Sequence, residues 1–188
     1  MAWRFSPSSF RRHQSGTAAI EFVLILPMLL TLYLGMVDLT AAITTTRQLS
    51  YSASVVGDLV TQYVTNISVA QINDSMRAAD LVMQSRSASA AEPRVEVITY
   101  RMVNNTVTML WRRTNSKGTA CTAPTTTGLA PLMSSGNDLV VVVACSIYTA
   151  QISRFLGENL LGQASFTFRE QIALRPRQAA VLNCIDCT

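Results

Sequence analysis

The stretch RRHQSGTAAIEFVLILP, residues 11–27, places a carboxylate, Glu21, inside an otherwise apolar run. Glu21 is the only formally charged residue among the 21 residues from Thr17 to Val37. As a helix these residues would measure roughly 30 Å, which matches the hydrocarbon core of a bilayer. No acidic residue precedes the run, and cations do, so the sequence predicts a cytoplasmic N-terminus with the remainder outside. The preceding cations are Arg4, Arg11 and Arg12.

The composition limits the kinds of function that the chain can have. Its 188 residues are enough for one domain and an anchor, and 49% of them are hydrophobic. The net charge of +4 is modest and does not indicate a nucleic-acid partner. The single histidine, His13, lies in the leader, so the rest of the chain has no imidazole for catalysis or metal binding. We expect no enzyme activity, no cofactor and no metal.

Glu21 argues against a simple signal peptide, although the small residues of LTAA, residues 39–42, offer a cleavage site near Ala42. A carboxylate deep in the membrane costs about 2–3 kcal/mol, and less near an interface. A signal peptide that is cut and discarded has no use for that cost. Pro27 removes one backbone hydrogen bond of the helix, so we expect a kink there.

The string SGTAAIEF resembles a prepilin peptidase site, with Gly16 followed five residues later by Glu21 and then by Phe22. The longer string GTAAIEFVLILPMLLTLYLGMVDL resembles the TadE-like pseudopilins of tight-adherence (Tad, or Flp) pilus systems. The resemblance is strong over residues 15–60 and weak beyond them. Thr17 departs from the phenylalanine that many type IV pilins have at this position. The chain is longer than a major Flp pilin and shorter than most TadG-like relatives, which favours a TadE or TadF label.

The resemblance implies roles for the residues around the cleavage site. Cleavage behind Gly16 would give Thr17 a free amine and make Glu21 the fifth residue of the mature chain. In pilins this glutamate is thought to meet the terminal amine of a neighbouring subunit, so Glu21 and Phe22 would be docking residues. A buried charge is expensive alone and tolerable when it is paired. The alternative is a snorkelling or protonated Glu21 without a partner.

Helical periodicity continues after Asp38 and predicts one long helix from about Thr17 to Val64. SVAQ, residues 68–71, reads as a capping box that begins a second helix, and residues 85–93 link it to β structure. The apolar stripe of the first helix comprises Leu39, Ile43, Leu49, Ala53, Val56, Val60, Tyr63 and Ile67, with Thr46 filling a gap.

A hairpin follows, with Asn104 and Asn105 as a two-residue type I′ turn between VEVITYRMV and TVTMLWRR. Two further strands, DLVVVVACSIY and QASFTFREQIALR, complete an α+β head with a roughly four-stranded antiparallel sheet. The turn predicts a register that pairs Met102 with Val107, Tyr100 with Met109, Ile98 with Trp111 and Glu96 with Arg113, the three apolar pairs all on one face.

The four cysteines lie late in the chain and are even in number, which favours disulfides in an oxidising compartment. In the cytosol they would instead be idle thiols or a metal site. Cys121 lies in a long polar loop, residues 114–137, and a bond to Cys145 would staple that loop to the third strand. Cys184 and Cys187 form a C-x-x-C pair at the tail, where only Thr188 follows, so thioredoxin-like catalysis is disfavoured. A bond between Cys145 and a tail cysteine remains an alternative.

The sequence therefore predicts a minor pseudopilin of a tight-adherence pilus, needed for pilus assembly, adhesion and biofilm formation. Its expected parts are a leader (1–16), a transmembrane helix (17–37), a helical stalk with a second helix (38–93), a β-rich periplasmic head (94–176) and a cysteine-containing tail (177–188). The expected location is the bacterial inner membrane. Expected partners are prepilin peptidase, other pilins, the Tad platform and membrane lipid. The alternatives are a secreted or anchored periplasmic enzyme or binding protein, and a pseudopilin of a type II secretion system.

Overall fold

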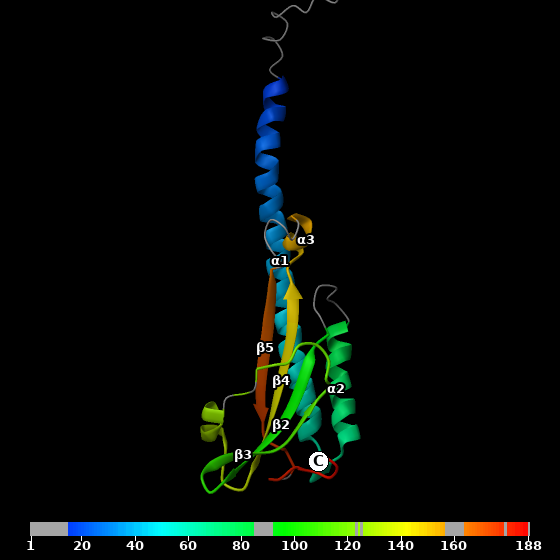
Figure 1. Ribbon diagram of the computed structural model, residues 1–188, viewed down its shortest axis with the longest axis vertical. Helices are drawn as coiled ribbons and strands as arrows, with labels where there is room; N and C mark the ends of the chain where they lie inside the picture. Colours follow the sequence, from blue (N-terminus) through cyan, green and yellow to red (C-terminus); the bar gives the residue numbers. More distant parts are fainter. Residues whose placement is uncertain are drawn as a thin grey trace, which may run out of the picture.

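A single long helix, α1, runs along the molecule in the computed structural model, which describes residues 15–84, 92–122, 124, 126–156, 164–178 and 180–187. α1 spans Ser15–Thr61, 47 residues, so it begins two residues before the predicted start and ends three before the predicted end. Figure 1 shows its N-terminal half standing clear of the head and its C-terminal half packed against it. α1 is long and apolar enough to cross a membrane once. The helix continues through Pro27, and the kink there stays a prediction.

The head is an antiparallel sheet of four strands in the order β3-β2-β4-β5, which confirms the predicted α+β class. The strands are β2 (Arg94–Val103), β3 (Thr106–Thr114), β4 (Asp138–Thr149) and β5 (Ser165–Leu174). The sequence did not predict five short elements: α3 (Gln151–Leu156), two turns of 3-10 helix in the long loop (Thr126–Gly128 and Ala130–Leu132), and the two-residue strands β1 (Asn66–Ile67) and β6 (Asn183–Cys184), which pair in parallel.

The predicted capping box opens the second helix, α2 (Val69–Gln84). The backbone N–H of Gln71 donates to the Ser68 hydroxyl, and the Gln71 side chain accepts from the Ser68 backbone N–H at 2.9 Å. This reciprocal pair satisfies two amide groups that a helix end otherwise leaves without partners.

The predicted hairpin is right near its turn and wrong beyond it. Asn104 and Asn105 both have positive φ, as a type I′ turn requires, and Tyr100 pairs with Met109 as expected. A β-bulge then shifts the register, so Ile98 faces Arg112 rather than Trp111, and Glu96 faces Thr114 rather than Arg113. The extra residue turns Trp111 to the opposite face of the sheet.

The sheet is buried on both faces. On one face, Val95, Val97, Val140 and Val142 pack against α1, α2 and Trp111. On the other, Ile98, Val141 and Val143 lie under the long loop, which contributes Cys121 and Leu129. β4 therefore reads as a nearly continuous apolar run, because neither side of it faces water.

The apolar stripe of α1 is half right. Leu49, Ala53, Val56 and Val60 are fully buried, as expected. Leu39 and Ile43 are wrong: they are 62% and 48% exposed. The buried stripe instead continues towards the N-terminus through Thr45 and Asp38, because these residues lie over Leu49 at the three-and-four spacing of a helix. Ile67 is buried too, but it lies in β1.

Gly57 marks the closest approach of α1 to the sheet. A Cβ atom at this position would lie 2.6 Å from Cδ1 of Leu174 and 3.5 Å from Cγ2 of Val142. Glycine costs a helix up to about 1 kcal/mol relative to alanine, so its presence here reflects lack of space.

We therefore expect Gly57→Ala to lower the free energy of unfolding by about 1 kcal/mol, because overpacking by roughly 1–3 kcal/mol exceeds the gain in helix propensity. Thermal unfolding of the detergent-purified protein, followed by circular dichroism, measures the change. The matched control is the same substitution in a Leu174→Ala background, where the clash is gone and the change should be neutral or stabilising. A stabilising effect of Gly57→Ala in the wild-type background would contradict this packing.

Candidate functional site

The expected processing segment lies at the free end of α1. Gly16 and Thr17 are exposed, and a Cβ atom at Gly16 would meet nothing within 4 Å. Glu21 and Phe22 follow on the first turns of the helix, and Phe22 is 59% exposed. Within the described residues, Glu21 takes part in no ion pair. The basic leader, with Arg4, Arg11, Arg12 and His13, lies outside the described residues. Cleavage behind Gly16 and docking through Glu21 stay predictions.

A second cluster joins α1 to the head at Asp38, directly after the predicted span. Asp38 is only 8% exposed, and its carboxylate accepts three hydrogen bonds. The donors are the Tyr148 hydroxyl at 2.9 Å and the backbone N–H groups of Gln151 at 2.7 Å and Ile152 at 2.8 Å. Asp38 thus caps α3, which lies beside α1 at the membrane-proximal end of the head (Figure 1). The negative carboxylate also meets the positive end of a helix.

These contacts determine the protonation of the pair. Burial raises the pKa of Asp38, but the bonds from Ile152, Gln151 and Tyr148 together outweigh it, so the pKa lies below its usual value of 3.8. Burial, together with the bond to Asp38, raises the pKa of Tyr148 to about 12. The phenol therefore stays protonated and donates at every physiological pH. The junction consists of a fixed anion and its neutral donor.

In the sequence, Asp38 marks only the end of the apolar run, and Tyr148 does not stand out. A signal was present, because Asp38 lies seven residues before Thr45 and eleven before Leu49, on the buried side of the helix. A carboxylate on an apolar stripe needs partners. Its partners lie more than 100 residues away along the chain, so no local pattern identified them.

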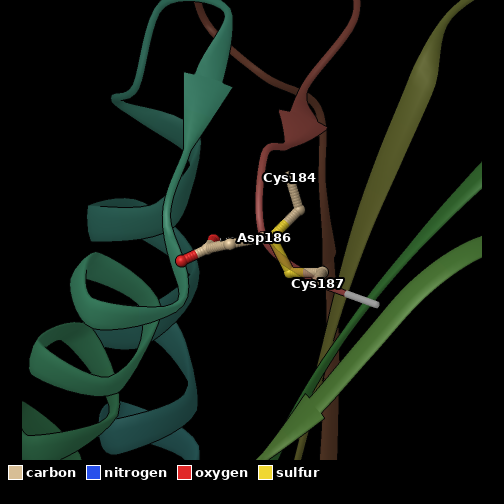
Figure 2. Close-up of side chains that lie close together, drawn as sticks. All are labelled: Cys184, Asp186 and Cys187. Carbon is tan, nitrogen blue, oxygen red and sulfur yellow. Dashed lines mark hydrogen bonds between the residues drawn. A yellow bond between two sulfur atoms is a disulfide. The ribbon is translucent and has the colours of Figure 1, made fainter.

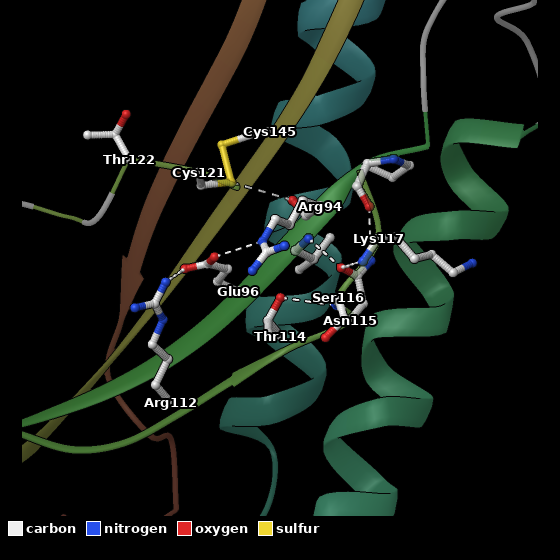
Figure 3. A network of polar contacts seen from close by, with 12 residues as sticks. Arg94, Glu96, Arg112, Thr114, Asn115, Ser116, Lys117, Cys121, Thr122 and Cys145 are labelled. Carbon is white, nitrogen blue, oxygen red and sulfur yellow. Dashed lines mark hydrogen bonds and ion pairs between the residues drawn. A yellow bond between two sulfur atoms is a disulfide. The ribbon is translucent and has the colours of Figure 1, made fainter. Parts of the chain in front are cut away.

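The predicted staple is present as a disulfide between Cys121 and Cys145. Beside it, Glu96 is fully buried and is paired with Arg94 at 3.0 Å and with Arg112 (Figure 3). The carboxylate is neutralised from two sides, which a buried charge requires. The expected cross-strand partner of Glu96, Arg113, instead donates to the backbone oxygen of Asp186. The bridge attaches the long loop to β4, and the ion pairs beside it lie within β2 and between β2 and β3.

The tail cysteines, Cys184 and Cys187, are bonded to each other, so the alternative bond from Cys145 to the tail is not formed. Figure 2 shows Asp186 pointing from the small loop between them towards the start of α2, where it accepts from the Val69 N–H at 2.8 Å. The ligand atoms of Cys184, Asp186 and Cys187 lie within 4.8 Å of one another. Cysteine binds a metal through its thiolate, however, and these two sulfurs are bonded to each other in a disulfide. The motif thus fastens the tail to α2.

Comparison with known families places the N-terminal region. Residues 16–57 match the family model described as TadE-like protein, so this part of the chain is a TadE-like domain. The match begins at the expected cleavage site and ends at Gly57, where α1 meets the sheet. The TadE-like family is a non-enzymatic, pilin-like family. No curated protein and no solved structure matches the chain. The predicted resemblance is confirmed over these residues.

The junction gives a stability that depends on pH. Because the folded pKa of Asp38 is depressed, its contribution is fully present above about pH 4, the unfolded value, and is lost as the pH falls through the folded value. We expect Asp38→Ala to cost on the order of 2–3 kcal/mol at pH 7, since it leaves buried donors without an acceptor. That difference from the wild type should shrink in acid.

The measurement is urea unfolding of the wild type and the variant from pH 3 to pH 7. Tyr148→Phe is the matched control, because it removes one donor of three and should cost about 1 kcal/mol. A constant Asp38→Ala difference across this pH range would refute the role of the carboxylate.

Proposed function

We propose, from the TadE-like domain at residues 16–57, that this chain is a minor pseudopilin of a tight-adherence pilus system. The family suggests a protein associated with the Tad pilus. The finer proposal is that prepilin peptidase cuts behind Gly16 and that the chain then helps to assemble the pilus, and through it adhesion and biofilm formation. Its task is docking with other pilins and with the inner-membrane platform.

One observation carries this proposal: Gly16 and Glu21 lie together at the free end of an exposed apolar helix. An open glycine gives a peptidase access to the backbone. The carboxylate, one turn beyond Thr17, belongs to the N-terminal half of α1, which stands clear of the head (Figure 1). A lone carboxylate in lipid is costly, and the new amine of a neighbouring subunit would neutralise it. Only a neighbour in the correct axial register offers that amine, so the cost of Glu21 becomes specificity for assembly.

The long helix also bears on location. α1 is consistent with a single membrane pass. The arginines of the leader favour a cytoplasmic N-terminus, and the head would then fold in the periplasm. Two disulfides are typical of that oxidising compartment. We place the chain in the bacterial inner membrane on these grounds.

The junction weighs against the signal-peptide alternative. Cleavage near Ala42 would remove Asp38, and with it the acceptor for Tyr148 and for the first amides of α3. The buried Tyr148 hydroxyl and the two partly buried amides would lose their acceptor, at a cost on the order of 2–3 kcal/mol in total. A leader that is cleaved and discarded would not be expected to supply a residue that makes these hydrogen bonds in the folded head. A pseudopilin of a type II secretion system would share these features, and the TadE-like match favours the Tad system over it.

Processing is tested by Gly16→Leu, which we expect to leave the full-length chain uncut, because the larger side chain blocks close access to the backbone. Immunoblotting of cells shows the length, and N-terminal sequencing of the wild type should start at Thr17. Gly35→Leu is the matched control, since this second glycine of α1 also has nothing within 4 Å of its Cβ position. If Gly16→Leu were still shortened by about 16 residues, with cleavage directed by the leader, the site would be wrong.

Docking is tested by Glu21→Ala. We expect normal membrane insertion, since the helix becomes more apolar, and normal cleavage, but weakened association with pilin partners. Removing one member of a buried pair costs about 3–5 kcal/mol, and less where water reaches the pair. Glu21→Gln should be intermediate, and Leu24→Ala, one turn further along, should have little effect. The measurements are crosslinking between helices and pilus counts. Normal values of both in Glu21→Ala would disprove docking through the carboxylate.

A further inference from the structure

Two large aliphatic side chains of α1 remain uncovered beyond the predicted span. Leu39 and Ile43 are 62% and 48% exposed, although they follow Asp38, at which the apolar run ends on the side facing the head. Asp38 is held by Tyr148 and α3, so α1 cannot move deeper into a membrane without breaking those bonds or drawing the head in with it. If the membrane surface were level with Asp38 all around the helix, both aliphatic residues would stand in water.

The apolar surface ends at different depths on the two sides of α1. Successive residues lie about 100° apart around a helix, so Asp38 and Arg47, nine residues apart, are on opposite sides. Ile43 lies within about 40° of Arg47. From Phe22 to Thr46, 25 residues, the only formal charge is Asp38, which faces the head. The free side is therefore uncharged for about 37 Å, longer than the roughly 30 Å of a hydrocarbon core.

A shallow groove crosses the same boundary. It has a volume of about 490 Å³ and is mostly apolar, with Tyr33, Met36 and Val37 on one side of Asp38 and Thr40, Ala41 and Thr44 on the other. The Thr40 and Thr44 hydroxyls donate to the carbonyls of Met36 and Thr40, at 2.9 Å and 2.8 Å. Their donors are satisfied within the helix, so these two threonines can meet hydrocarbon without leaving a donor unpaired.

We propose that this face, Leu39, Ile43 and the groove, lies in the outer leaflet of the membrane, with Arg47 at the level of the phospholipid headgroups. The inference rests on the proposed role of α1 as a membrane anchor and adds a second lipid-contacting surface beside the head. The occupant is phospholipid: acyl chain against the groove and headgroup phosphate near the guanidinium. An apolar residue followed one turn later by arginine suits this place, because an arginine stem can lie in the apolar layer while its charge reaches the phosphates.

The apolar surface extends further along the free side of α1 than along the side facing the head, so the helix must be tilted relative to the membrane normal. The last apolar residue on the free side, Ile43, lies five residues beyond Asp38, about 7.5 Å along the axis. Across a helix about 10 Å wide, that step corresponds to a tilt of roughly 35–40°, the upper end of the range for membrane helices. Tilting is also how a helix accommodates an apolar stretch longer than the bilayer. The head would then lean away from the membrane normal, with the free face of α1 turned towards the lipid.

Spin labels on the processed protein, which lacks only the leader, test this placement in phospholipid vesicles. All four native cysteines are in disulfides, so Leu29→Cys, Ile43→Cys and Tyr51→Cys each add one labelling site on the free side of α1. Relaxation by oxygen, which concentrates in lipid, is compared with relaxation by a water-soluble nickel chelate. We expect Leu29 and Ile43 to be several-fold more accessible to oxygen, and Tyr51 to be more accessible to nickel.

Each other result overturns a specific step. If Leu29 reports lipid and Ile43 reports water, the lipid-facing surface is wrong and the anchor stands. If Leu29 also reports water, the anchor, and the proposed function with it, is wrong. If the label at Ile43 is shielded from both reagents at every protein-to-lipid ratio, another part of the same protein covers the face. If that shielding disappears when the protein is diluted with lipid, and the label then becomes accessible to the nickel chelate, a second copy covers the face. Either result excludes lipid as the occupant.

Discussion

The bond set of Asp38 is the constraint on which the arrangement of helix and head depends. One carboxylate joins α1 to the end of β4 through Tyr148 and to α3 through two backbone amides. Below it, the valines of β2 and β4 and the close approach at Gly57 hold the helix against the sheet over its C-terminal half. Packing alone would permit sliding along the helix axis, because apolar contacts have little direction. Hydrogen bonds to a fixed anion do not permit this sliding, so Asp38 fixes the position along α1 at which the proposed anchor ends and the head begins.

The head itself is stabilised from three sides. The helices cover one face of the sheet, and the long loop, fastened by the Cys121–Cys145 bridge, covers the other. The tail closes the end of the head furthest from the free half of α1, where Leu182 is fully buried and donates its N–H to Asp138, and where Asp186 caps α2. Most of the exposed large hydrophobic side chains among the described residues belong to α1, which agrees with the proposed assembly and membrane contact.

Local rules predicted the elements well and long-range contacts poorly. The capping box at Ser68 and the turn at Asn104 rest on neighbouring residues, so spacing alone revealed them. The sequence pattern does not reveal the bulge next to Tyr100. One extra residue leaves the alternation of Leu110 and Trp111 ambiguous, and it reverses the face of the sheet on which the following side chains lie. The predicted buried stripe of α1 is wrong at Leu39, because an apolar side chain need not be a buried one. Gly16 and Glu21 were recognised through their spacing, whereas Asp38 depended on partners that only the fold supplies.

The separation of these partners along the chain has a consequence for biogenesis. Tyr148 follows Asp38 by 110 residues, so α1, as the proposed anchor, would enter the membrane long before the groups that donate hydrogen bonds to Asp38 had crossed. During that interval Asp38 must be solvated by water at the outer surface, which stops the helix from slipping inward. Loop closure over such a distance is slow, and the last strand, β5, is needed to complete the four-stranded sheet. A nascent chain would therefore hold its anchor at the right depth first by hydration, and only later by folding.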